Sequence, residues 1–157
     1  MRAELDFLLP SGHFRAVVPI RPFESYCFSF AKSRHGTQDI SDDILSEAWS
    51  HWCSKTLDYL RLKRDHGSLV VMLNFAEVLV DAKAVMRRLC DALRIPFNDS
   101  CTVPTVFGVP TRGNSSFGTR ESERGKVYRS PSSRYLPEER IPKAYDDIWA
   151  RCREEFL

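Results

Sequence analysis

Arg21 and Ser29 are the residues whose types and spacing point most directly to chemistry. Arg21 follows the apolar run 16–20 (AVVPI), and Ser29 comes eight positions after it. A guanidinium delivered by a buried strand can bind a phosphate through two parallel hydrogen bonds. A helix that starts just after the strand would add free backbone N–H groups and the positive end of its dipole. The pair therefore indicates a phosphate-binding site.

The same residues also fit a purely structural role. An arginine after a strand is often solvated or ion-paired at the surface, and Glu24 lies close enough in sequence to be the partner of Arg21. Ser29 would then be a solvated residue of the following helix.

The elements that must position these residues begin with a strand over residues 14–20. Pro19 is unusual there, because proline lacks the backbone donor that a central strand needs. A turn and a helix are expected over residues 22–32. A long helix is expected over 39–63, where apolar residues recur every three to five positions.

Gly67 should end the long helix, and residues 68–73 then form a nearly continuous apolar stretch. Such a stretch is typical of strands in parallel sheets that are covered on both faces. Asp81 is a candidate N-cap for a further helix that ends before Pro96, and a last helix is expected over 143–156. The order of strands and helices predicts an α/β fold with a parallel sheet.

Residues 98–133 are rich in Pro, Gly, Ser and Thr and lack helical periodicity, which predicts a long irregular loop segment. A loop of this length in a compact domain is usually functional or mobile. Basic residues gather in and just after it, and they could bind an anion or belong to a solvated loop. They are Arg112, Arg120, Arg124, Lys126, Arg129 and Arg134.

Two segments after Ser29 resemble motifs of the sulfotransferase family. Residues 69–81 (LVVMLNFAEVLVD) are similar to a strand followed by the YEDL..DP stretch, with Phe75 for the tyrosine and Glu77 for the second acid. Residues 104–117 (PTVFGVPTRGNSSF) resemble the late P-T...G-x-P...N-S-S-F segment of bacterial members. We expect Glu77 to cap or brace the neighbouring helix rather than to take part in chemistry.

This resemblance covers most of residues 14–157 and implies a P-loop NTPase-like sulfotransferase fold, here a partial parallel sheet flanked by helices. The family transfers a sulfuryl group from 3′-phosphoadenosine 5′-phosphosulfate (PAPS) to a hydroxyl or amine acceptor, with no obligatory metal. Arg21 and Ser29 match the pair that holds the donor's 3′-phosphate. Arg112 and Gly113 stand where a late Arg/Lys-x-Gly segment closes over that phosphate, and a plain turn is the alternative for these two.

The family's other half-site, a PKSGTTW-type loop that receives the 5′-phosphosulfate, has no counterpart in this sequence. None of the seven glycines lies in a Gly-x-x-x-x-Gly-Lys-Ser/Thr pattern, and the family's catalytic base precedes the arginine strand. We therefore interpret residues 1–157 as a single partial sulfotransferase domain that keeps the 3′-phosphate-binding half and is inactive alone. The alternatives are a truncated, non-catalytic fragment that binds adenosine 3′,5′-bisphosphate (PAP) weakly or acts only as an interaction module, and a protein whose start is misassigned.

The composition of the chain also bears on other classes of protein, such as nucleic-acid-binding, membrane and metal-binding proteins. The net charge of +2 over 157 residues is too small to indicate nucleic acid or an anionic membrane as a partner, and no apolar run is long enough to span a bilayer. Four histidines and five scattered cysteines show no metal-ligand spacing. The odd number of cysteines fits a reducing cytoplasm better than a disulfide framework. An uncovered sheet edge in a partial domain is expected to favour self-association.

Overall fold

The computed structural model describes residues 8–103, 105–106, 109–110 and 136–157. The chain forms two compact units, each of which is described by itself. The first unit runs to Phe75 and resumes at Arg134, and the second unit is Ala76–Ser133.

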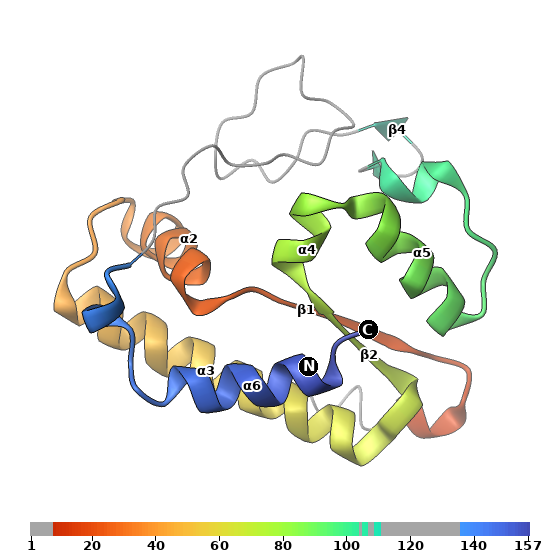
Figure 1. The fold of residues 1–157 in the computed structure, drawn as a ribbon, viewed down its shortest axis with the longest axis horizontal. Helices are drawn as coiled ribbons and strands as arrows, with labels where there is room; N and C mark the ends of the chain where they lie inside the picture. Colours follow the sequence, from red (N-terminus) through yellow and green to blue (C-terminus); the bar gives the residue numbers. More distant parts are fainter. Residues whose placement is uncertain (1–7, 104, 107–108, 111–135) are drawn as a thin grey trace. The chain divides into compact units, whose positions relative to one another are not determined.

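Two parallel strands form the sheet of the first unit, β1 (Ala16–Ile20) and β2 (Val70–Asn74) (Figure 1). The predicted parallel sheet is therefore present, and the chain is a mixed helix and strand structure that is mostly helical. On the other side of β2, Phe156 forms a parallel bridge with Met72, and the backbone N–H of Leu157 donates to the Met72 carbonyl at 3.3 Å.

The two strands differ in burial. Residues Val70 to Leu73 of β2 are all buried, as expected for a strand covered on both faces. β1 alternates instead, and Val17 is 39% exposed, so the expectation of a strand buried throughout is wrong for β1. Pro19 lies inside β1, which pairs on one side only among the described strands, and such an edge strand tolerates a missing N–H donor.

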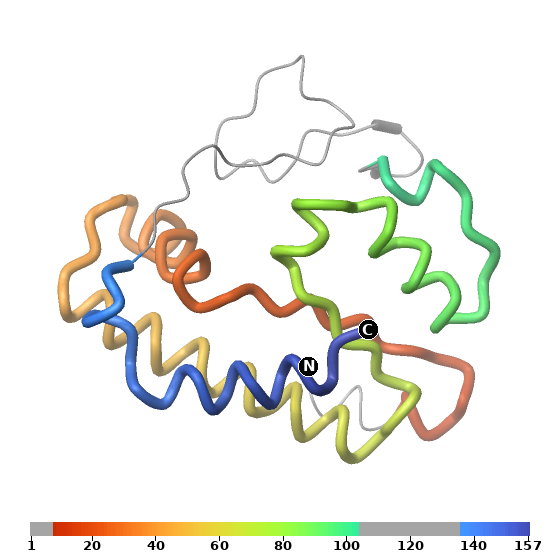
Figure 2. Tube along the Cα trace, viewed as in Figure 1, coloured from red at the N-terminus to blue at the C-terminus, as the bar shows by residue number. Residues whose placement is uncertain are grey.

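The described residues of this unit also form three long helices: α2 (Phe23–His35), α3 (Asp42–His66), which packs against β2, and α6 (Tyr145–Glu155). α3 packs against both α2 and α6, and Figure 2 shows α3 and α6 running side by side. α3 begins after Ser41, whose hydroxyl accepts a hydrogen bond from the Ile44 N–H at 3.3 Å, and Gly67 ends it as predicted. Three short 3-10 helices complete the unit: Leu9–Ser11, Gly67–Leu69 and Glu138–Arg140.

Aromatic side chains from these helices form the centre of the core. Phe23 of α2 is fully buried and packs edge-on against Trp49 of α3, with ring centroids 5.2 Å apart. Trp52 and Tyr145 also lie against Phe23, at centroid distances of 5.8 and 6.2 Å. Each such ring pair is worth about 0.5–1.5 kcal/mol beyond the area it buries. The cluster therefore fixes α2 relative to α3 and α6.

The second unit contains α4 (Phe75–Val80, which begins at the boundary), α5 (Ala82–Leu93), the 3-10 helix η3 (Asp99–Thr102), and the antiparallel strands β3 (Thr105–Val106) and β4 (Val109–Pro110). The Asp81 carboxylate accepts from the Ala84 N–H at 3.0 Å, so the predicted N-cap is confirmed. η3 and the short hairpin interrupt the stretch that was expected to be irregular. Asn98 starts η3, because its side chain accepts from the Ser100 N–H at 2.9 Å.

Candidate functional site

Arg21 and Phe75 directly follow the two parallel strands. Because Ile20 pairs with Asn74, the residue after each strand leaves the sheet at the same end. The guanidinium carbon of Arg21 lies 4.6 Å from the centroid of the Phe75 ring, a cation–π contact. In α/β sheets the carboxyl ends of parallel strands are where ligands bind. The fold therefore brings a residue of the first motif against a residue of the second at a position suited to a ligand.

Among the described residues, no carboxylate pairs with the charge of Arg21. Arg21 is partly buried, and the loss of hydration lowers its pKa from the ordinary value, while the electrostatic interaction with Tyr26 acts in the opposite direction. No ion pair to Arg21 occurs within the part of the chain that the structure describes. A guanidinium that has lost part of its hydration and lacks a counter-ion is suited to an anionic ligand.

Glu24, the alternative partner of Arg21, is engaged elsewhere. The hydroxyl of Tyr145 donates a hydrogen bond to Glu24 Oε2 at 3.1 Å. Tyr145 is 6% exposed, and burial together with the Glu24 charge raises the pKa of its hydroxyl far above the ordinary value. The proton therefore stays on Tyr145, and Glu24 is held as its acceptor. The surface ion pair considered for Arg21 and Glu24 is not formed.

The main chain of Arg21 is held as well. The indole Nε1 of Trp52 donates to the Arg21 carbonyl at 2.8 Å, and Trp52 is only 3% exposed. A buried indole usually has such an acceptor. Trp52 is one of the apolar residues that recur over 39–63, a pattern that indicates a core position but does not identify the acceptor of its indole N–H.

Ser29 lies in the second turn of α2, three residues after Tyr26, so the two are neighbours on the helix surface. Tyr26 in turn interacts electrostatically with Arg21, which places Arg21, Tyr26 and Ser29 in one neighbourhood. The hydroxyls of Ser25 and Ser33 donate to carbonyls of their own helix at 3.1 and 3.2 Å. No described residue hydrogen-bonds to the Ser29 hydroxyl, which is therefore available to an acceptor outside the helix.

Tyr26 also forms a hydrogen-bonded pair with an exposed histidine of α3. Its hydroxyl lies 2.5 Å from Nδ1 of His51, the ring planes differ by 8° and the centroids are 6.1 Å apart. At that separation the rings meet edge to edge in nearly one plane. Burial is the main reason that the pKa of Tyr26 is raised. His51 thus serves as a packing and hydrogen-bonding partner of Tyr26.

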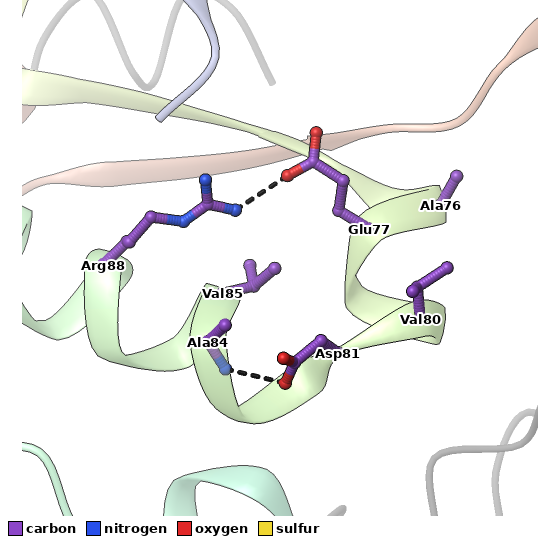
Figure 3. A pocket seen from close by; sticks show the side chains of 7 residues that line it. All are labelled: Ala76, Glu77, Val80, Asp81, Ala84, Val85 and Arg88. Atoms are coloured by element: carbon purple, nitrogen blue, oxygen red, sulfur yellow. Dashed lines mark hydrogen bonds and ion pairs between the residues drawn. The ribbon is translucent and has the colours of Figure 1, made fainter.

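The second unit contains a shallow pocket of about 280 Å³, which Figure 3 shows from close by. Its polar residues contact one another: Glu77 Oε2 lies 2.7 Å from Arg88 Nη2, and Asp81 caps α5. Glu77 therefore braces α5, as predicted. The remaining lining is aliphatic: Ala76, Val80, Ala84 and Val85.

Arg112 and Gly113, the other predicted phosphate contacts, lie outside the described residues. Within the described ranges, no cluster of three or more His, Cys, Asp or Glu residues is placed to hold a metal ion. No helix in those ranges is both long and apolar enough to cross a bilayer.

Comparison of the chain with models of known families, with curated proteins and with solved structures gave no match. The function is therefore inferred from the residues and their geometry.

Proposed function

We propose that this protein is sulfotransferase-like, and that Arg21 and Ser29 bind the 3′-phosphate of the nucleotide sulfate donor PAPS. One observation carries the proposal: Arg21 is a partly buried guanidinium at the carboxyl end of a parallel strand, without a counter-ion in the described part of the chain. Phe75, at the tyrosine position of the second motif, directly follows the neighbouring strand β2 and contacts the Arg21 guanidinium.

The fold that goes with this proposal is a partial P-loop NTPase-like sulfotransferase fold. In support of it, β1 and β2 are parallel neighbours joined through α2 and α3, and their carboxyl ends lie together. The sulfate donor would bind at the carboxyl ends of β1 and β2, and the protein would act in the cytoplasm. The family reaction moves the sulfuryl group in line to a hydroxyl or amine and depends on positioning and on charge stabilisation.

In the bound state the 3′-phosphate would accept two N–H bonds from the fork of Arg21 and one hydroxyl bond from Ser29. Charge-assisted bonds of this kind are worth about 1.5–3 kcal/mol each. The side chain needs little reorganisation, because Phe75 contacts its guanidinium and Trp52 holds its main chain. A nucleotide without a 3′-phosphate would lose these contacts, so the site should distinguish PAP from 5′-AMP.

Calorimetry with PAP and 5′-AMP tests the proposal. We expect PAP to bind with roughly micromolar to millimolar affinity and more tightly than 5′-AMP. Arg21→Ala should weaken PAP binding by about 10- to 150-fold and bring it close to that of 5′-AMP. Equal affinity for the two nucleotides would show that no 3′-phosphate site exists.

Arg61→Ala is the matched control, because it removes one arginine charge from α3. Arg61 is exposed, and its Nη1 lies 3.4 Å from a carboxylate oxygen of Asp58 on the same helix. PAP affinity should be unchanged in this variant. An equal loss in the Arg21 and Arg61 variants would indicate general charge attraction and would overturn the assignment.

A second candidate function, a non-catalytic interaction module, is favoured by the surface around β1. Phe14 is 50% exposed and Val17 is 39% exposed, so apolar side chains face solvent on and just before an edge strand. Such a strand can pair with a further strand from another chain. If no nucleotide binds while self-association through β1 is found, this function replaces the first.

A further inference from the structure

α5 and the segment that follows it pack against each other in the second unit. The chain reverses direction after α5 at Arg94, which adopts the left-handed conformation with φ of 58°. Lys83, Arg87 and Cys90 share one face of α5, because they are four and three positions apart. The returning residues 97–101 lie along this face.

Each of these three α5 residues has a partner in the returning segment. Lys83 Nζ lies 2.8 Å from Asp99 Oδ1, and the Arg87 guanidinium carbon lies 5.1 Å from the centroid of the Phe97 ring. The third pair is formed by cysteines, since the thiols of Cys90 and Cys101 interact with each other. The ion pair and the cation–π contact thus hold η3 against the face of α5 that carries Cys90.

The two cysteines differ in access to solvent. Cys101 is exposed, whereas Cys90 is only 3% exposed, and both are free thiols. Burial, followed by the interaction with Cys101, raises the pKa of the Cys90 thiol. Cys101 is therefore the thiol that meets a dissolved oxidant first, and Cys90 is the second thiol within its reach.

We propose that Cys90 and Cys101 form a reversible intramolecular disulfide when a hydroperoxide oxidises Cys101. The Cys101 thiolate attacks the peroxide, the O–O bond breaks, and Cys101 becomes a sulfenic acid; the other oxygen leaves as an alcohol, or as water when the oxidant is hydrogen peroxide. The Cys90 sulfur then attacks the Cys101 sulfur, the S–S bond forms, the S–O bond breaks, and water leaves with the Cys90 proton. The two thiols lose two electrons and two protons, and two molecules of a small thiol such as glutathione restore them by exchange.

The disulfide would fasten η3 and the returning segment to α5 covalently. Without it, that packing depends on the Lys83–Asp99 ion pair and the Arg87–Phe97 contact, and exposed contacts of this kind contribute little. We expect backbone amides of residues 95–103 to exchange more slowly with solvent after oxidation. This site goes beyond the proposed nucleotide function and does not depend on it.

Peptide mapping of the full chain tests the proposal. After treatment with hydrogen peroxide and blocking of the remaining thiols, trypsin should release residues 89–94 and 95–112 as one linked species, since cleavage follows Arg88, Arg94 and Arg112. A reductant should separate the two peptides. Sulfinic Cys101 without a linked species, or Cys101 joined to Cys101 of a second chain, would overturn the proposal.

Single substitutions assign the two roles. In Cys90→Ser, Cys101 should stop at the sulfenic acid and be trapped by dimedone, and in Cys101→Ser, Cys90 should stay reduced. Cys53→Ser, in α3 of the first unit, is the control and should keep the linked species. A further control is the chain unfolded in urea, where the yield should fall several-fold. An equal yield there would show that the fold does not bring the two sulfurs together.

Discussion

The indole Nε1 of Trp52 donates a 2.8 Å hydrogen bond to the main-chain carbonyl of Arg21. This bond joins the middle of α3 to the turn between β1 and α2. The residue proposed to bind phosphate is therefore held at its main chain by one aromatic residue and at its side chain by another, Phe75. Arg21 is positioned before any ligand arrives.

Trp52→Phe should weaken PAP binding several-fold and lower the free energy of unfolding by about 1–3 kcal/mol, because the Arg21 carbonyl loses its donor while an aromatic ring remains. Calorimetry and urea unfolding give the two values. Trp49→Phe is the control, since no described residue accepts from the Trp49 indole and Trp49 is only partly buried. If both variants bind PAP equally well, the Trp52 bond does not position Arg21.

The two acidic residues that support α5 should differ in their contribution to stability. Asp81→Ala removes the N-cap and should cost about 1 kcal/mol. Glu77→Gln breaks the ion pair with Arg88. The Glu77 and Arg88 side chains are 46% and 48% exposed, so the free energy of unfolding should fall by less than about 0.5 kcal/mol. Urea unfolding of both variants checks the order. A larger loss for the Glu77 variant would mean that this carboxylate does more than brace α5.

Alkaline pH should destabilise the first unit through Cys27. This thiol is fully buried, and burial raises its pKa to about 11. In the unfolded chain the thiol ionises near its ordinary pKa. At a pH between the unfolded and the folded pKa, the folded state therefore keeps the thiol proton that the unfolded state has lost. Stability is then complete below the unfolded pKa and is lost as the pH rises through about 11. Urea midpoints measured from pH 8 to 11 should fall less steeply for Cys27→Ala than for the wild type, and parallel slopes would contradict this.

Val17→Lys should reduce self-association. Val17 is an exposed apolar residue of the edge strand β1, and a lysine on such a strand opposes pairing with another chain. Light scattering at several protein concentrations measures the effect. Ile95→Lys is the control, because Ile95 is 50% exposed but lies in the second unit. A monomeric wild type, or an equal effect of the two lysines, would show that β1 is not the contact.

The elements predicted with most success are those determined by local pattern. The apolar spacing of α3, the stop at Gly67 and the cap at Asp81 all depend on residues within a few positions of each other. α4 was not predicted, because six residues that include two valines fit a strand or a helix equally well.

The features of the candidate site that the sequence did not show are long-range. The sequence indicated that Arg21 follows a strand and that Ser29 lies on the next helix, and both positions are as expected. It could not show whether Glu24 pairs with Arg21, since that depends on a tyrosine 121 positions away. The acceptor of the Trp52 indole, 31 positions away, was equally out of reach.

The distance in sequence between Glu24 and Tyr145 has a consequence for synthesis on the ribosome. Arg21 and Glu24 emerge early, while α6, which carries Tyr145, is made only after the whole second unit. Until α6 has been made, Glu24 has no tyrosine donor. The last helix therefore completes the surroundings of Arg21, because it brings the hydroxyl that Glu24 accepts from in the folded chain.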